Sequence, residues 1–286
     1  MINKTAAIIS ILALTAIGIC FYFYNCRGKI SMITANSITK PVDKFHQKLF
    51  SEHKSELKET DTEFIALFDN FAFNEVTTHS NLDLQTRIKI ILASTIATQS
   101  LSEYKIMVKV GLNNDVTPVE IKEIAYQAVP YLGISKVYDF LIATNHIFKE
   151  AGIALPLPNQ ATTTPETRFD KGLAQQKAIF GEHIDNMRQN APKNQKHIQD
   201  YLSANCFGDY YTRNGLDIKT RELLTFAMLV SLGGADNQVK GHIQGNLNVG
   251  NDKQILIDAV TQLLPFIGYP RTLNALAALN EIVPEK

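Results

Sequence analysis

The feature that most constrains this chain is an internal repeat of about 135 residues. Residues 82–87 (Leu-Asp-Leu-Gln-Thr-Arg) align with residues 216–221 (Leu-Asp-Ile-Lys-Thr-Arg) at an offset of 134, and one inserted residue near Gly233 then raises the offset to 135. The aligned identities beyond this insertion include Gln127 with Gln262, Pro130 with Pro265, Gly133 with Gly268, and Leu141 with Leu276. Because these matches are collinear with a single gap, the sequence predicts two copies of one structural module.

Local patterns within each copy are helical. Leu84, Ile88 and Ile91 recur at the spacing of one helix face. Residues 117–120 (Thr-Pro-Val-Glu) combine a capping box with proline at the first helical position. Ser135 is expected to cap the last helix of the first copy. No long alternating pattern typical of strands occurs, so we expect an all-α fold.

The domain organisation follows from where the patterns break. The first module is expected to span residues 41–150 and the second residues 168–283. Residues 151–167 contain three prolines and three consecutive threonines, which is typical of a linker. A further helix over residues 169–189 is expected to introduce the second copy.

The N-terminus differs from the rest of the chain. Residues 6–24 are apolar, Lys4 precedes them, and Arg27 and Lys29 follow. Nineteen residues at helical rise span about 28 Å, close to the thickness of a bilayer core. Residues 1–29 are therefore expected to be a membrane anchor or a cleaved signal peptide, with a buried core helix as the alternative. We expect an exported, extracytoplasmic protein that contacts a membrane only through this segment.

The charge balance excludes one class of partner. The chain has 28 basic and 28 acidic residues. Removing Lys4, Arg27 and Lys29 with the N-terminal segment leaves 25 basic against 28 acidic residues, a formal charge of −3. A protein that binds nucleic acid by neutralising phosphates would carry a positive excess, so no nucleic-acid partner is expected.

Two stretches carry a resemblance to a known family. Residues 103–121 and residues 233–242 each resemble the core motif of carboxymuconolactone decarboxylase-like proteins. The resemblance implies two tandem helical modules of the alkylhydroperoxidase D-like fold. Single-module relatives form trimers or hexamers, so the resemblance implies a homo-oligomer, namely a trimer of this two-module chain.

The redox relatives in this superfamily use a glutamate, a Cys-x-x-Cys pair and a histidine. Aligned on that pattern, the second copy has Glu222 and His242 but carries Ala235 and Gln238 at the cysteine positions. The first copy keeps none of the four. Dithiol peroxidase chemistry needs a reactive thiolate and a second thiol to resolve the sulfenic acid, so that cycle is not expected here.

The non-redox relatives transfer protons around a small acid, which His242 and Glu222 could do as a catalytic pair. His242 could instead be a hydrogen-bonded core histidine, and Glu222 a helix-terminus charge or an ion-pair partner of Arg221. Gln238 and Asn246 lie one helical turn on either side of His242 and could bind substrate or only the histidine. Arg221 could be structural or could anchor an anionic substrate.

Cys206 is the only cysteine outside the N-terminal segment. It could be a small buried residue or a single reactive thiol. The histidines are scattered without ligand spacing, so we expect neither a metal nor a cofactor. Three hypotheses follow: an acid–base enzyme acting on a small anionic molecule, a peroxide-handling protein that uses Cys206, and a non-catalytic assembly or binding module.

Overall fold

The computed structural model describes residues 55 and 57–285, and every regular element in this part of the chain is helical. The predicted all-α class is therefore confirmed. The expected anchor or signal peptide at residues 1–29 lies outside the described residues. None of the helices that the structure describes is both long and apolar enough to cross a membrane.

The first copy contains α3 (Leu57–Thr60), α4 (Thr62–Asn70), the π-helical η2 (Phe71–Glu75), α5 (Val76–Thr78), α6 (Leu84–Ala97), α7 (Leu101–Asn113), α8 (Pro118–Leu132) and α9 (Ile134–Glu150). Thr117 and Glu120 form the predicted capping box at the start of α8. The prediction for Ser135 was wrong, because α9 already begins at Ile134. Gly133 has a φ of 83°, which only glycine adopts readily, and it ends one helix and starts the next.

The second copy contains α10 (Arg168–Phe180), α11 (His183–Asn190), the 3₁₀ turn η3 (Lys193–Gln195), α12 (Lys196–Tyr201), the π-helical η4 (Leu202–Tyr211), α13 (Ile218–Leu232), α14 (Asp236–Asn248) and α15 (Lys253–Ile282). Gly268 has a φ of 76° and kinks α15. It is the residue aligned with Gly133, which separates α8 from α9 in the first copy. The single helix expected over residues 169–189 was wrong, since Gly181 has a positive φ and divides it into α10 and α11.

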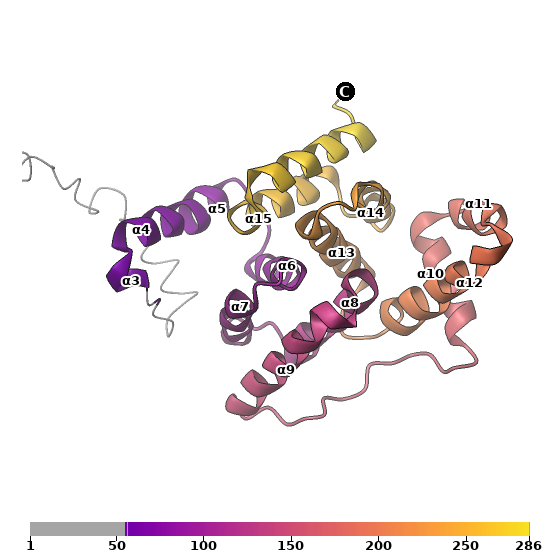
Figure 1. Ribbon diagram of the computed structural model, residues 1–286, viewed down its shortest axis with the longest axis horizontal. Helices are drawn as coiled ribbons and strands as arrows, with labels where there is room; N and C mark the ends of the chain where they lie inside the picture. The colour runs from indigo at the N-terminus through magenta and orange to yellow at the C-terminus, as the bar shows by residue number, and fades with distance from the viewer. Residues whose placement is uncertain (1–54, 56, 286) are drawn as a thin grey trace, which may run out of the picture.

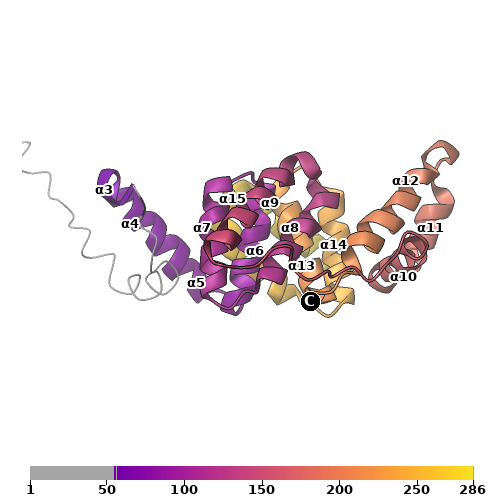
Figure 2. The same cartoon turned by 90° about the horizontal axis from the view of Figure 1, so that it is seen from below.

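The two copies pack as partners in one body. α6 and α13 pack against each other at the centre of the molecule, and α7, α8, α9, α14 and α15 lie around them (Figure 1). α8 of the first copy packs against α13, and α15 of the second copy packs against α6. One hydrophobic cluster contains buried residues from both copies, so the core is continuous across the repeat. α3 and α4 project at one end of the elongated molecule and α10–α12 at the other (Figure 2).

Two polar contacts repeat across this arrangement. Arg221 of α13 donates to Gln127 of α8 at 2.8 Å, and Arg87 of α6 donates to Gln262 of α15 at 2.7 Å. Since these are aligned residues of the two copies, each arginine binds the glutamine of the opposite copy. This reciprocity indicates an approximate two-fold relation between the modules.

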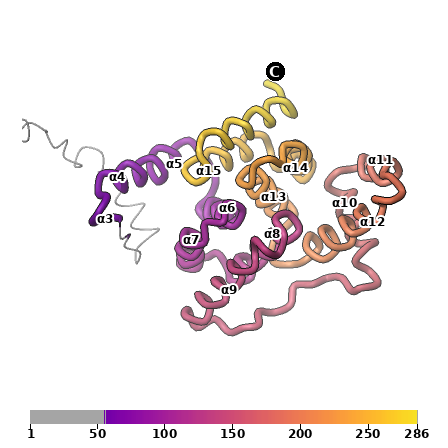
Figure 3. The backbone as a smooth tube through the Cα atoms, in the orientation of Figure 1, coloured from indigo at the N-terminus to yellow at the C-terminus, as the bar shows by residue number. Residues whose placement is uncertain are grey.

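α10, the first helix of the second copy, packs against η4 with the two backbones in close contact. At Gly172 in α10 an added Cβ would lie 2.0 Å from the carbonyl oxygen of Ser203, and Gly208 in η4 is equally crowded by Arg168. Only glycine permits helices to cross this closely. Residues 151–167 contain no helix and run along the outside of the molecule from α9 to α10 (Figure 3).

Candidate acid–base site

The structure brings Glu222 and His242 into direct contact. Asp217 caps α13 by accepting from the backbone N–H of Thr220, which starts the helix and places Glu222 in its second turn. His242 lies in the middle of α14. Its Nδ1 is 2.9 Å from Oε2 of Glu222, within hydrogen-bonding range. Glu222 is fully buried and His242 is 8% exposed, so only the histidine reaches towards solvent.

Gly245 allows this contact to form. A Cβ at this position would lie 2.5 Å from Oε2 of Glu222 and 2.8 Å from the ring of Phe180. Neither distance is tolerated by real side chains, so the carboxylate occupies the space that a larger residue would fill. The glycine on α14 therefore leaves room for the Glu222 carboxylate beside His242.

The second oxygen of Glu222 is also bound. Tyr211, the last residue of η4, donates its hydroxyl to Oε1 at 2.7 Å. The same hydroxyl lies 2.8 Å from the hydroxyl of Thr225. Burial, and then the negative charge of Glu222, hold the pKa of Tyr211 well above its ordinary value. Tyr211 therefore stays protonated at neutral pH and keeps its role as a donor.

The first copy contributes a residue to this site. Tyr131, near the end of α8, donates to the Tyr211 hydroxyl at 3.0 Å. Its ring meets the His242 ring edge-on, with 5.5 Å between centroids, and Phe180 of α10 meets the same imidazole at 5.4 Å. Burial raises the pKa of Tyr131 well above its usual range. His242 thus lies between aromatic rings from both copies.

Asn246 and Gln238 occupy different environments. Asn246 is fully buried, and its amide nitrogen donates to the backbone carbonyls of Glu222 and His242. Its side-chain oxygen accepts from Asn251 at 2.8 Å. These contacts join α14 to α13, which favours a positioning role for Asn246. Gln238 is exposed in the first turn of α14, so its predicted contact with substrate stays a prediction.

Arg221 points away from the His–Glu pair towards the first copy. It is 1% exposed and donates to Gln127 and to the carboxylate of Glu123. It also donates to the backbone carbonyls of Arg213 and Asn214. The buried guanidinium therefore joins the copies, and these contacts favour the structural interpretation over anchoring of a substrate.

Cys206 lies in η4 and is 5% exposed. Burial raises the pKa of its thiol to about 12, and the nearby charge of Glu222 adds to that shift. At neutral pH the group is therefore a protonated thiol, whereas peroxide chemistry needs the thiolate. The environment argues for a packing role and against the single-thiol hypothesis.

Metal binding has little support in the described part of the chain. No group of three or more histidine, cysteine, aspartate or glutamate side chains there could hold a metal ion. The expectation of no metal and no cofactor stays a prediction. Tyr131, Tyr211 and Phe180 could not be identified as site residues from the sequence, because their places depend on packing between elements that are distant in sequence. The one local signal was the abundance of aromatic and polar residues in the stretch 205–213 around Cys206.

The fold and this site define an all-α protein of two fused helical modules with a buried His–Glu pair in the second. The chain belongs to the carboxymuconolactone decarboxylase family, whose sequence model matches residues 62–146 and 196–281. The predicted tandem membership is thereby confirmed. Both matched segments begin at corresponding helices, α4 and α12.

Two relatives are decarboxylases. A 4-carboxymuconolactone decarboxylase of Acinetobacter baylyi is 28% identical over 128 residues, which covers 42% of this chain and 95% of the relative. A nitrosuccinic acid decarboxylase of Metarhizium robertsii is 26% identical over 116 residues, which covers 40% of this chain and 80% of the relative. Each of these matches spans less than half of this chain, which agrees with two modules here.

Proposed function

We propose that the second module is an acid–base site that decarboxylates a small organic acid, with the first module as its structural partner. The observation that carries the proposal is the 2.9 Å contact between Nδ1 of His242 and Oε2 of Glu222. The names of the two relatives support loss of carbon dioxide from a small anionic substrate. Export through residues 1–29 is part of the proposal and rests on their sequence pattern alone.

The chemistry assigns each residue a task. When carbon dioxide leaves, the electron pair of the broken bond stays on the substrate carbon, which must then receive a proton. Since Glu222 holds Nδ1, Nε2 of His242 is the nitrogen that would deliver this proton. The carboxylate fixes the ring and stabilises the imidazolium, and Tyr211 fixes the carboxylate. The buried surroundings strengthen these interactions because little water competes.

The experiment measures release of carbon dioxide from carboxymuconolactone and nitrosuccinate by the full-length protein. His242→Gln and Glu222→Gln should each lower kcat by at least about 100-fold, the usual contribution of a general acid or base. His183→Gln is the matched control, because His183 is exposed on α11. Unchanged activity in His242→Gln, or an inactive wild-type protein on both acids, would overturn the proposal.

A further inference from the structure

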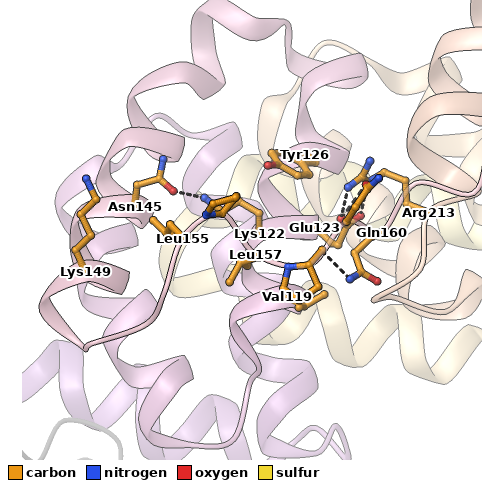
Figure 4. A pocket seen from close by; sticks show the side chains of 13 residues that line it. Val119, Lys122, Glu123, Tyr126, Asn145, Lys149, Leu155, Leu157, Gln160 and Arg213 are labelled. Carbon is orange, nitrogen blue, oxygen red and sulfur yellow. Dashed lines mark hydrogen bonds and ion pairs between the residues drawn. The ribbon is translucent and has the colours of Figure 1, made fainter.

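A hollow lies on the first copy, away from the His–Glu pair. It opens between α8, α9 and the segment that joins α9 to α10, and its volume is about 580 Å³ (Figure 4). Sites for small molecules occupy roughly 300–1,000 Å³, so the space suits one such ligand. Neither His242 nor Glu222 lines it. The hollow is therefore distinct from the candidate acid–base site.

The charged groups around this hollow have a positive excess. Lys122, Lys149 and Arg213 line it, and Glu123 is the one acidic residue among the lining residues. Glu123 is already bound by two arginines, since Arg213 and Arg221 both lie within 3.0 Å of its carboxylate. The one acid of the lining is thus neutralised, and the two lysines remain to attract an anion.

Lys122 is the group that points most clearly to a ligand. It is 7% exposed, yet its ammonium contacts only a neutral side chain, the amide oxygen of Asn145, and lies 5.4 Å above the ring of Phe148. No carboxylate lies within ion-pairing distance of it among the described residues. Burying an ammonium without an anion is costly, so an anion beside it would gain a strong interaction. Burial accordingly lowers the pKa of Lys122.

Part of the remaining wall of the hollow is apolar, beside the polar side chains of Asn145, Asn159 and Gln160. Val119 and the ring of Tyr126 extend from α8, and Leu155 and Leu157 extend from the segment between α9 and α10. Such surfaces hold a hydrocarbon or aromatic body by excluding water from it. A ligand that satisfies both parts of the hollow carries an acid group at one end and an apolar body at the other.

We propose that this hollow binds a small amphipathic organic acid, with the carboxylate between Lys122 and Lys149 and the apolar body against Val119, Leu155 and Leu157. The linker is then part of a binding site as well as a connection between the copies. This site performs no chemistry and is independent of the proposed decarboxylation.

The test is isothermal titration calorimetry of the full-length protein with 3-phenylpropionate, with its uncharged amide and with inorganic phosphate. The carboxylate should bind at one site. Lys122→Gln should weaken binding by about ten-fold and Lys149→Gln by a smaller factor. Lys136 is exposed on α9, the helix that also carries Lys149, and Lys136→Gln should have no effect. Lys149 is exposed, so its variant tests the charge without disturbing the core.

His242→Gln separates this site from the proposed active site. Binding that survives His242→Gln supports the present proposal whether or not the protein is a decarboxylase. Several results would overturn it: equal binding of acid and amide, binding of phosphate as tight as that of the acid, and unchanged binding in both lysine variants. Loss of binding in His242→Gln, or no binding at millimolar acid, would also contradict it.

Discussion

At the scale of single residues, Cys206 shows how burial controls reactivity. The thiol lies beside Tyr131 and near the charge of Glu222, with almost no exposure to water. Both burial and the neighbouring charge disfavour the thiolate, and the pKa rises from 9.0 to about 12. A cysteine in such surroundings contributes packing, and its titration becomes linked to folding.

This linkage predicts a pH dependence of stability. Between pH 9 and pH 12 the unfolded chain loses the Cys206 proton and the folded chain keeps it, so the free energy of unfolding falls as pH rises through this window. From pH 9 to pH 11 the wild type should lose about 2–3 kcal/mol more than Cys206→Ala. Urea unfolding of both proteins at several pH values measures the difference. Parallel curves for the two proteins would show that the thiol is not perturbed.

Some site residues could be predicted from the sequence and others could not, depending on whether a motif or only tertiary packing determines their position. Glu222 and His242 were found because an aligned motif places them 20 residues apart on neighbouring helices. Tyr211 and Phe180 lie on η4 and α10, whose packing against α13 and α14 no local spacing encodes. The sequence allowed either a structural or a substrate-binding role for Arg221, and only its contacts with Gln127 and Glu123 favour the structural role.

At the scale of elements, the packing of the Glu222 carboxylate and the Phe180 ring against α14 depends on one glycine, and a second glycine provides the control. Gly245→Ala places a methyl group 2.5 Å from the Glu222 carboxylate and 2.8 Å from the Phe180 ring, so these side chains must shift. We expect a loss of about 1–3 kcal/mol in the free energy of unfolding, the usual cost of overpacking. The proposed activity should fall as well, because the His242–Glu222 contact lengthens.

Gly241→Ala is the matched control for this experiment. It lies one turn earlier on α14, and a Cβ there meets nothing within 4 Å. Alanine is the better helix former, so this variant should be unchanged or more stable by up to about 1 kcal/mol. Thermal unfolding of both variants provides the comparison. Equal effects of the two substitutions would contradict the crowding inferred at Gly245.

Helix ends could be predicted from the sequence where a side chain caps the backbone. They were harder to predict where a glycine with a positive φ ends the helix. Thr117 caps α8 as expected, because its side chain accepts from a first-turn N–H group, and Asp252 caps α15 in the same way. Gly181 was missed as a break, since a glycine inside a periodic apolar pattern signals only weakly. The π-helical η4 was also not expected. It supplies both Cys206 and Tyr211, and wide turns of this kind often occur at functional sites.

At the scale of the whole molecule, duplication explains the division of labour between the copies. Arg87 and Arg221 each bind the glutamine of the opposite copy, so these residues recur where packing requires them. The position aligned with His242 in the first copy is Met107, which is buried in the core. The first copy instead provides Tyr131 to the site of the second. Fusion of two modules thus allows one to keep the site residues while the other supports it.

The family resemblance also implies that three copies of this two-module chain assemble into a trimer. Tyr269 and Leu273 lie one turn apart on α15 and are about 60% exposed, so this helix offers an apolar face that a neighbouring copy could cover. We predict that light scattering after size exclusion of the detergent-solubilised protein gives a mass about three times 31.9 kDa. Leu273→Asp should shift the particle to single chains, whereas Ile198→Asp, exposed on α12, should leave it intact. A wild-type protein with the mass of one chain would exclude the trimer, and dissociation by Ile198→Asp alone would place the contact on α12.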